Sequence, residues 1–375
     1  MEKQLNIENL KNAMQKAGFS QSSLADKLGV SREAVSKWLS GNKFPRPDKL
    51  LRLGLTLDLG VKELVTLVEA VGEPVIAFRK RANIKITNDH IAHATSMGKM
   101  LSALVPYLPY NLLVRPATLK DPTCNYGYIQ RVVRQIRTEI GISPQDELGF
   151  HHLIKKFDEL QAVLIPVLWG EKEKHENALH IYLPDSMTTW VYLNLDVNAH
   201  DFKFWMAHEL GHIHAPNLRG DEAEDFADAF AGALIFPESL AEEAYKNIKR
   251  SHTEKSQITK VKRYAEQFDI SLVSVYYEIN KYAEHYGLEP IKIGNNLFAV
   301  NTNFNKNFYN VSETIFGGEH PDAKHYIRVC EEVFNTPFFE TLRSFLAEQR
   351  KSAGFIQCIL DTPLLDAKGI HAELS

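Results

Sequence analysis

The residues with the clearest chemistry lie in the segment Phe202–His212, which contains the pattern His208-Glu209-Leu-Gly-His212. On a helix, His208 and His212 lie one turn apart on the same face, so both imidazoles can reach one metal ion. Glu209 lies beside them, where it can polarise a metal-bound water. Zinc suits such a site because it accepts nitrogen and oxygen ligands and keeps one position open. The pattern predicts a hydrolytic zinc site, and its apolar neighbours favour a buried helix over a solvated one.

A zinc site of this kind needs a third protein ligand, and the acidic segment Asp221–Phe236 supplies candidates. Glu224 and Asp228 lie one helical turn apart. We expect Glu224 to bind the zinc and Asp228 to accept the second ring N–H of a ligand histidine. Other acids of the segment remain alternatives, although several must face solvent: Asp221, Glu222 and Asp225.

A second pattern lies near the N-terminus, where the spacing predicts two short helices on either side of Gly29. Gly29 permits the tight turn, and Ser31 is a natural N-cap for the second helix. The second helix directs its apolar residues inward, which leaves a polar outer face: Arg32, Glu33, Ser36 and Lys37. This geometry is the one that enters the major groove of double-stranded DNA. A small bundle that binds only protein is the alternative.

The charge distribution favours the DNA interpretation. Residues 1–55 carry ten Lys and Arg against five acids, whereas the rest of the chain carries 33 against 42, so the net charge of −4 averages two opposite parts. The first residues contain no apolar signal core, and no apolar run is long enough to cross a bilayer. Three widely separated cysteines exclude a disulfide framework and a thiolate metal site. We expect a cytoplasmic protein without a membrane segment.

The hydrophobic periodicity predicts an α+β fold that is mostly α. Residues 1–70 form a helical DNA-binding domain, with helix continuing to about 75, and residues 71–119 form a connector. Residues 120–287 form the metal-binding domain, with strands at 162–168, 178–183 and 188–195 and helices at 202–214 and 221–234. Residues 288–375 form a C-terminal region of unknown role, strand-like at 290–300 and helical afterwards.

Both patterns resemble known families. Residues 6–56 resemble the XRE, or lambda-repressor-like, helix-turn-helix family through the run Gln21–Gly41. The resemblance implies that Gln21 touches phosphate or a base edge, that Arg32, Glu33 and Lys37 face bases with Ser36 beside them, and that a homodimer or paired sites read the operator. His-Glu-Leu-Gly-His followed by Glu-x-x-x-Asp is the gluzincin arrangement. With Leu-Ile-Phe-Pro after it, residues 120–285 resemble the ImmA/IrrE metallopeptidases. The segment 255–285 resembles the helix-turn-helix-like end of that family, where packing against the peptidase is commoner than reading DNA.

Several other residues have open roles. The strand Thr188–Asn194 leads to the metal helix, and it is either an edge strand that pairs with substrate or an ordinary core strand. Tyr192, His180 or His200 could stabilise an oxyanion. His214 lies off the ligand face, and His320 and His325 fit a solvated helix start.

We therefore expect a DNA-binding transcriptional regulator with zinc-dependent endopeptidase activity. The resemblance implies a protein substrate of the repressor or antitoxin type, in a stress, prophage or toxin–antitoxin setting. The alternative is a repressor or antitoxin whose metallopeptidase-like domain is a non-catalytic sensor or interaction module, against which the retained Glu209 speaks. Self-cleavage is a third interpretation.

Overall fold

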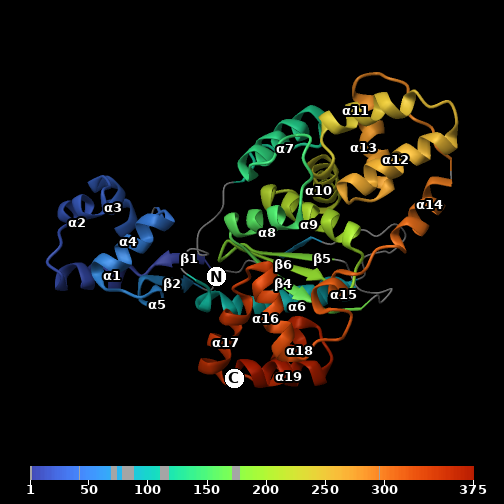
Figure 1. The fold of residues 1–375 in the computed structure, drawn as a ribbon. Helices are drawn as coiled ribbons and strands as arrows, with labels where there is room; N and C mark the ends of the chain where they lie inside the picture. The colour runs from blue at the N-terminus through green and yellow to red at the C-terminus, as the bar shows by residue number, and fades with distance from the viewer. Residues whose placement is uncertain are drawn as a thin grey trace.

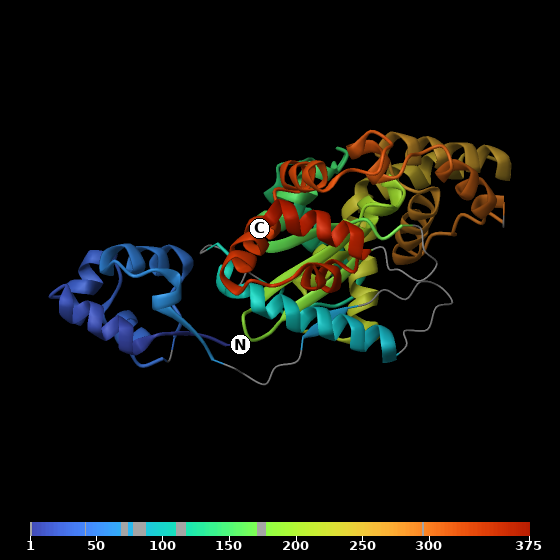
Figure 2. The same cartoon turned by 90° about the horizontal axis from the view of Figure 1, so that it is seen from below.

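The computed structural model describes residues 2–41, 43–68, 74–77, 88–109, 118–170, 178–294 and 296–375. The fold is α+β and mostly α, as the periodicity predicted. Figure 1 shows a small N-terminal unit beside a larger body, and Figure 2 shows the same separation from below. Each has its own hydrophobic core: residues from Leu5 to Val65 form one cluster, and residues from Ala94 to Leu374 form the other.

The N-terminal unit consists of short helices closed by a two-stranded ribbon. Its elements are β1 (Glu2–Leu5), α1 (Ile7–Lys16), α2 (Gln21–Leu28), α3 (Arg32–Leu39), α4 (Pro47–Leu57), α5 (Val61–Leu64) and β2 (Val65–Val68). Ser20 and Ser31 cap α2 and α3, and Gly29 adopts a left-handed conformation with φ of 63° between them. The Lys49 ammonium donates to the Leu28 carbonyl at 3.0 Å, which ties α4 to this turn.

The prediction that helix continues from 57 to 75 is wrong for the described residues, and 69–73 lie outside them. After the four residues of α5 the chain becomes β2, which pairs antiparallel with β1 so that Leu5 lies opposite Val65. β-branched valines favour a strand here. Pairing with the start of the chain supplies the tertiary contact that periodicity within the segment could not reveal.

The body is built on a four-stranded sheet. Its strands are β3 (Val75–Ala77), β4 (Ala162–Val167), β5 (Ala178–Leu183) and β6 (Thr188–Asn194), in the order β3-β5-β6-β4. β4 runs parallel to β6, whereas β5 is antiparallel to both of its neighbours. All seven residues of β6 are buried because β6 is an inner strand. Of the two interpretations of this strand, the core strand is therefore correct and the edge strand is wrong.

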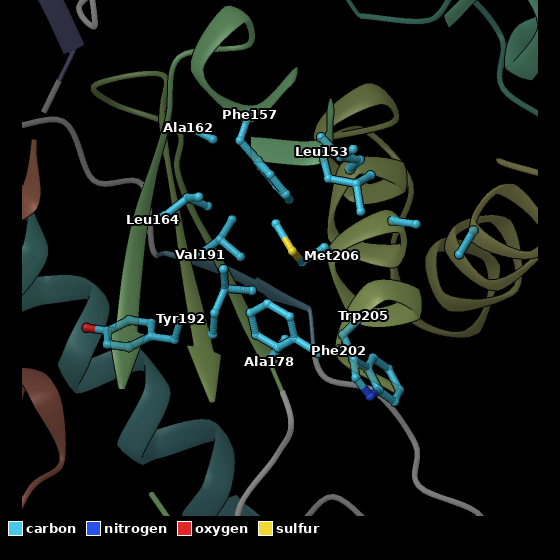
Figure 3. Packing of buried hydrophobic residues seen from close by; sticks show 14 of the residues in the cluster. Leu153, Phe157, Ala162, Leu164, Ala178, Val191, Tyr192, Phe202, Trp205 and Met206 are labelled. Carbon is cyan, nitrogen blue, oxygen red and sulfur yellow. The ribbon is translucent and has the colours of Figure 1, made fainter. Parts of the chain in front are cut away.

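Helices cover both faces of this sheet (Figure 1). The body's first helices are α6 (Asn88–Leu104), the short 3-10 helix η1 (Val105–Tyr107), α7 (Tyr126–Ile140), α8 (Phe150–Glu159), α9 (Ala199–His214) and α10 (Gly220–Ile235). They are followed by α11 (Glu238–Lys249), α12 (Glu254–Phe268) and α13 (Leu272–His285). Figure 3 shows Met206 and Phe202 of α9 and Phe157 of α8 packed on the face of the sheet that carries Val191. Tyr192, the next residue, points to the opposite face.

Helices of the C-terminal region cover that opposite face, except for α14 (Asn296–Asn305), which packs on α13. The region also contains α15 (Val311–Phe316), α16 (Ala323–Phe334), α17 (Phe338–Gln349), α18 (Ala353–Leu360) and α19 (Leu364–Leu374). The Tyr192 hydroxyl donates to the Ile359 carbonyl at 2.8 Å, and the Trp169 indole donates to the Leu360 carbonyl at 2.9 Å. The expected strand at 290–300 is absent from its described residues, which hold an irregular segment and the start of α14.

The stretch 71–119, interpreted as a connector, contributes β3, α6 and η1 to the body. β3 joins the sheet beside β5, and α6 packs against β3 and β5. Gly98 of α6 makes this packing close, because a Cβ there would lie 2.6 Å from Cβ of Pro74. Pro74, just before β3, therefore lies in a close contact between a helix and the start of an edge strand.

Candidate metal centre and DNA-reading helix

The candidate metal centre forms where α9 and α10 pack closely against each other. Gly211, inside the His-Glu-Leu-Gly-His pattern, allows this approach: a Cβ on Gly211 would lie 2.9 Å from Cα of Ala227. The close crossing brings Glu224 of α10 against the two histidines of α9. Gly211 is therefore needed for the close packing of the two helices.

The structure brings His208, His212 and Glu224 to one point. The two Nε2 atoms lie 3.0 Å apart, and each lies 3.4 Å from one oxygen of the Glu224 carboxylate. Together they form a group whose candidate ligand atoms all lie within 4.8 Å of one another. Nitrogen ligands of tetrahedral zinc, at about 2.0–2.1 Å from the metal, are separated by about 3.3 Å. The donor set and its spacing therefore fit zinc.

Asp228 stands behind His208, as the sequence suggested. Its Oδ1 lies 2.9 Å from Nδ1 of His208. This hydrogen bond fixes the ring with Nε2 directed at His212 and Glu224, which is the arrangement that orients a metal-ligating histidine. The alternative acids Asp221, Glu222 and Asp225 are all exposed on α10.

The electrostatics of the group also favour a cation. Burial lowers the pKa of His212 well below its usual value, with smaller contributions from His208 and His180. Burial likewise raises the pKa of Glu224. Burial opposes protonation of His208 too, but hydrogen bonds to Asp228 and Glu224 outweigh it and raise its pKa to about 9. A buried cluster of this kind is costly without a partner charge, and a divalent cation would offset that cost.

Glu209 lies beside the candidate ligands and faces His180 of β5. Oε2 of Glu209 and Nδ1 of His180 are 3.6 Å apart, and both atoms are buried without a hydrogen-bond partner in the described part of the chain. The His180 ring lies 5.5 Å from the His212 ring. Of the three residues considered for oxyanion stabilisation, His180 alone is placed at the centre.

The other two candidates lie elsewhere. Tyr192 bonds to Ile359 on the far face of the sheet. His200 lies at the start of α9, where its Nε2 is 3.0 Å from Oδ1 of Asp269. His214 is buried against Phe230, off the ligand face, and His325 lies in the first turn of α16, where its backbone N–H donates to Asp322.

A cleft of about 130 Å³ opens beside the candidate metal centre. His180, His212 and Glu224 line it on one side, and Val75 and Ile76 of β3 line it on another. The sequence analysis did not anticipate β3 as a wall of this cleft. The only signal in the described residues was the short apolar run Val75-Ile76-Ala77 after Pro74, which is too short to predict a strand.

The N-terminal unit presents the predicted polar face. Gln21 lies at the start of α2. The three residues expected to face bases, Arg32, Glu33 and Lys37, are exposed on α3, as is Ser36 beside them. The inward residues Val35 and Trp38 are buried. Because α3 is held from behind by the domain core, its outer face is free to meet a groove.

The helices α12 and α13 form a turn similar to that between α2 and α3, but the start of their second helix is covered. Asp269 adopts a left-handed conformation with φ of 50°, and Ser271 caps α13, so the turn resembles that between α2 and α3. The backbone N–H of Leu272 donates to Asn301 of α14 at 3.1 Å, and α14 packs on α13. The start of α13 is therefore covered within the body, unlike that of α3.

Fold and site together define a class of protein: a DNA-binding helix-turn-helix unit joined to a metallopeptidase-like body. Comparison with known families agrees for both parts. Residues 10–64 match the family described as Helix-turn-helix, and residues 165–280 match the family described as IrrE N-terminal-like domain. The chain is thus a fusion of an XRE-type helix-turn-helix domain with an IrrE/ImmA-like peptidase domain. A search of curated proteins found no match to the chain.

The second match begins in β4 and ends in α13. It includes all the candidate ligands and leaves β3, α6 and the C-terminal helices outside. Among the described helices, none is long and apolar enough to cross a bilayer.

Proposed function

We propose that the protein is a cytoplasmic transcriptional regulator with zinc-dependent endopeptidase activity, which cleaves a repressor-type or antitoxin-type protein. The observation that carries the proposal is the convergence of His208, His212 and Glu224 with Glu209 beside them. A purely structural metal site would not require the buried carboxylate of Glu209 at this position. We assign His208, His212 and Glu224 as zinc ligands and Asp228 as the residue that orients His208.

The mechanism follows from what each side chain can do. Zinc, when bound, would supply a Lewis acid that polarises a peptide carbonyl and lowers the pKa of water. Glu209 accepts the proton from the attacking water and delivers it to the leaving amine. His180, from β5, is placed to donate a hydrogen bond to negative charge that develops on the carbonyl oxygen. Burial of these groups strengthens each interaction by excluding bulk water.

The DNA-binding unit supplies the regulatory half of the proposal. Arg32, Glu33, Ser36 and Lys37 would contact bases, with Arg able to pair with guanine and Glu able to accept from cytosine. Gln21 and the surrounding basic residues would contact phosphates. A homodimer would place two such helices on a two-fold operator. The fusion then delivers the peptidase to protein targets bound at the same DNA.

The test uses purified, zinc-loaded protein and candidate repressors encoded near its gene. We expect the wild type to cleave one of them into defined fragments and Glu209→Gln to leave it intact while retaining zinc. Equal fragments from both chains would assign the cleavage to a contaminant. Zinc-loaded wild type that cleaves none of them would favour the non-catalytic sensor.

A further inference from the structure

The edge of the sheet nearest the candidate metal centre is held by the chain's own strand β3. This strand pairs antiparallel with β5, with Val75 opposite Tyr182, Ile76 opposite Ile181 and Ala77 opposite His180. β3 is the outermost described strand on this side of the sheet. It therefore occupies the backbone edge of β5 next to the residue that faces Glu209.

The strand narrows the cleft. With Val75 and Ile76 as a wall, the cleft measures about 130 Å³. Pockets that hold even drug-sized ligands measure about 300–1,000 Å³. β3 therefore takes the position in which an extended peptide would pair with the edge of β5.

A peptide on the outer edge of β3 would also lie too far away. Neighbouring strands are about 4.8 Å apart, so such a peptide would be one full strand spacing farther from β5 than β3 is. His180 is on β5, and its Nδ1 lies 3.6 Å from Glu209. Only a peptide paired with β5 itself would bring its carbonyls to this pair of residues.

β3 is held more weakly than the rest of the sheet. Among the described residues it forms three residue pairs with β5, whereas β5 and β6 form six. Val75 and Ile76 are only partly buried. The residue before the strand is Pro74, which has no N–H to donate to a neighbouring strand and is typical of sheet edges. Besides β5, its described neighbours are α10 and α6, with Pro74 lying against Gly98 of α6.

We propose that β3 is a built-in occupant of a peptide-binding edge on β5, and that an extended apolar segment of a protein partner displaces it. The partner segment is a short β-forming stretch that, like Val75 and Ile76, carries branched apolar side chains and binds by strand addition. The proposal rests on the proposed function only for the cleavage that would follow, because the binding step needs no catalysis.

β3 follows the DNA-binding unit closely in the chain. β2, which belongs to the DNA-binding unit, ends at Val68, seven residues before β3 begins at Val75. Seven residues span at most about 25 Å. β3 therefore begins within about 25 Å of the end of the DNA-binding unit.

The experiment measures binding of a fluorescent synthetic peptide with the sequence of residues 72–79 to the full-length, zinc-loaded Glu209→Gln chain. Two variants weaken β3: Ile76→Asp, and Gly98→Ala, whose Cβ would meet Pro74 at 2.6 Å. A third, Val75→Cys with Tyr182→Cys, locks β3 to β5, because directly opposite residues have Cβ atoms close enough for a disulfide. The exposed Cys124 and Cys358 are replaced by serine in every chain. Gly127→Ala is the matched glycine control, since its Cβ would meet only ordinary contacts.

We expect both weakened chains to bind the peptide about ten-fold more tightly than the parent, because affinity scales with the fraction of chains whose edge is open. The locked chain should bind only after reduction. Zinc content and the circular dichroism spectrum of the folded chain should match the parent in the variants compared. Equal affinity in the parent, weakened and locked chains, or no binding to the weakened ones, would overturn the proposal. If the peptide binds to this edge but the chain with the native Glu209 cleaves no protein, the proposed peptidase function fails and the proposal for β3 stands.

Discussion

At the residue scale, the two histidines follow directly from their spacing, whereas the other members of the centre do not. Four acids precede Asp228 on α10, and the sequence alone could not decide which of them is the third metal ligand. The crossing at Gly211 selects Glu224, because it decides which turn of α10 meets α9. The sequence could not show which of His180, Tyr192 and His200 lies at the centre, because this too depends on how distant segments pack. Which face of a strand meets a helix is a property of tertiary packing.

The contact between Asp228 and His208 gives a first prediction. Asp228→Ala removes the acceptor at 2.9 Å from Nδ1 of His208, so that ring loses its fixed orientation. Loss of such a partner typically lowers metal affinity about 10–100-fold. Competition with a zinc chelator measures the change. Asp225→Ala, an exposed acid on the same helix, is the control, and equal affinity of the two variants would refute the orienting role.

The outer face of α3 gives a second prediction. Arg32→Ala should relax preference at one base pair of the operator by about 1–3 kcal/mol, the usual value of a bidentate base contact. The operator is first selected from random-sequence DNA with the wild type. Arg52→Ala, exposed on α4, should weaken binding without changing the preferred sequence. An unchanged sequence preference in Arg32→Ala would mean that this residue reads no base.

At the element scale, the packing of α9 against α10 controls the centre. Gly211→Ala would place a Cβ 2.9 Å from Cα of Ala227 and 3.3 Å from the Phe230 ring, which forces the helices apart. We expect unfolding free energy to fall by about 1–3 kcal/mol, as in other overpacked cores, together with zinc affinity. Denaturant titration and chelator competition measure the two effects. Gly127→Ala should be neutral or stabilising by up to about 1 kcal/mol, and a similar result for Gly211→Ala would contradict this account.

The junction of α9 with α12 is held by ion pairs that depend on pH. A hydrogen bond from His200, and the charge of the buried Lys203, lower the pKa of Asp269. A carboxylate with a lowered pKa in the folded state stabilises the fold above its unfolded pKa of about 3.9, and this stability is lost as pH falls through the folded value.

Asp269→Asn tests this junction, and asparagine tolerates the left-handed conformation found there. The variant should unfold more easily than the wild type at pH 7, and the difference should shrink as the pH falls below about 3.9. Denaturant titrations at several pH values measure it. The exposed Asp158→Asn should show little difference at any pH, and a difference for Asp269→Asn that stays constant with pH would rule out the ion pair as its cause.

At the scale of the whole molecule, the two units account for the split in charge. The positive excess lies in the unit that carries α3, and part of the negative excess lies on α10 around Glu224. The helical class and the strands β4, β5 and β6 could be predicted from periodicity, because each is long or strongly alternating. β2, β3 and the packing of residues 296–375 on the sheet could not, because each depends on a partner distant in sequence.

The most direct test of the central claim is a mass-spectrometric survey of new protein N-termini in cells that express this protein. Cells with the zinc-loaded wild type are compared with cells that carry Glu209→Gln at equal abundance. We predict a small set of new N-termini, from one or a few DNA-binding or antitoxin-type proteins, that is present with the wild type and absent with Glu209→Gln. Identical sets of N-termini in both cells would contradict the assignment of this chain as a peptidase.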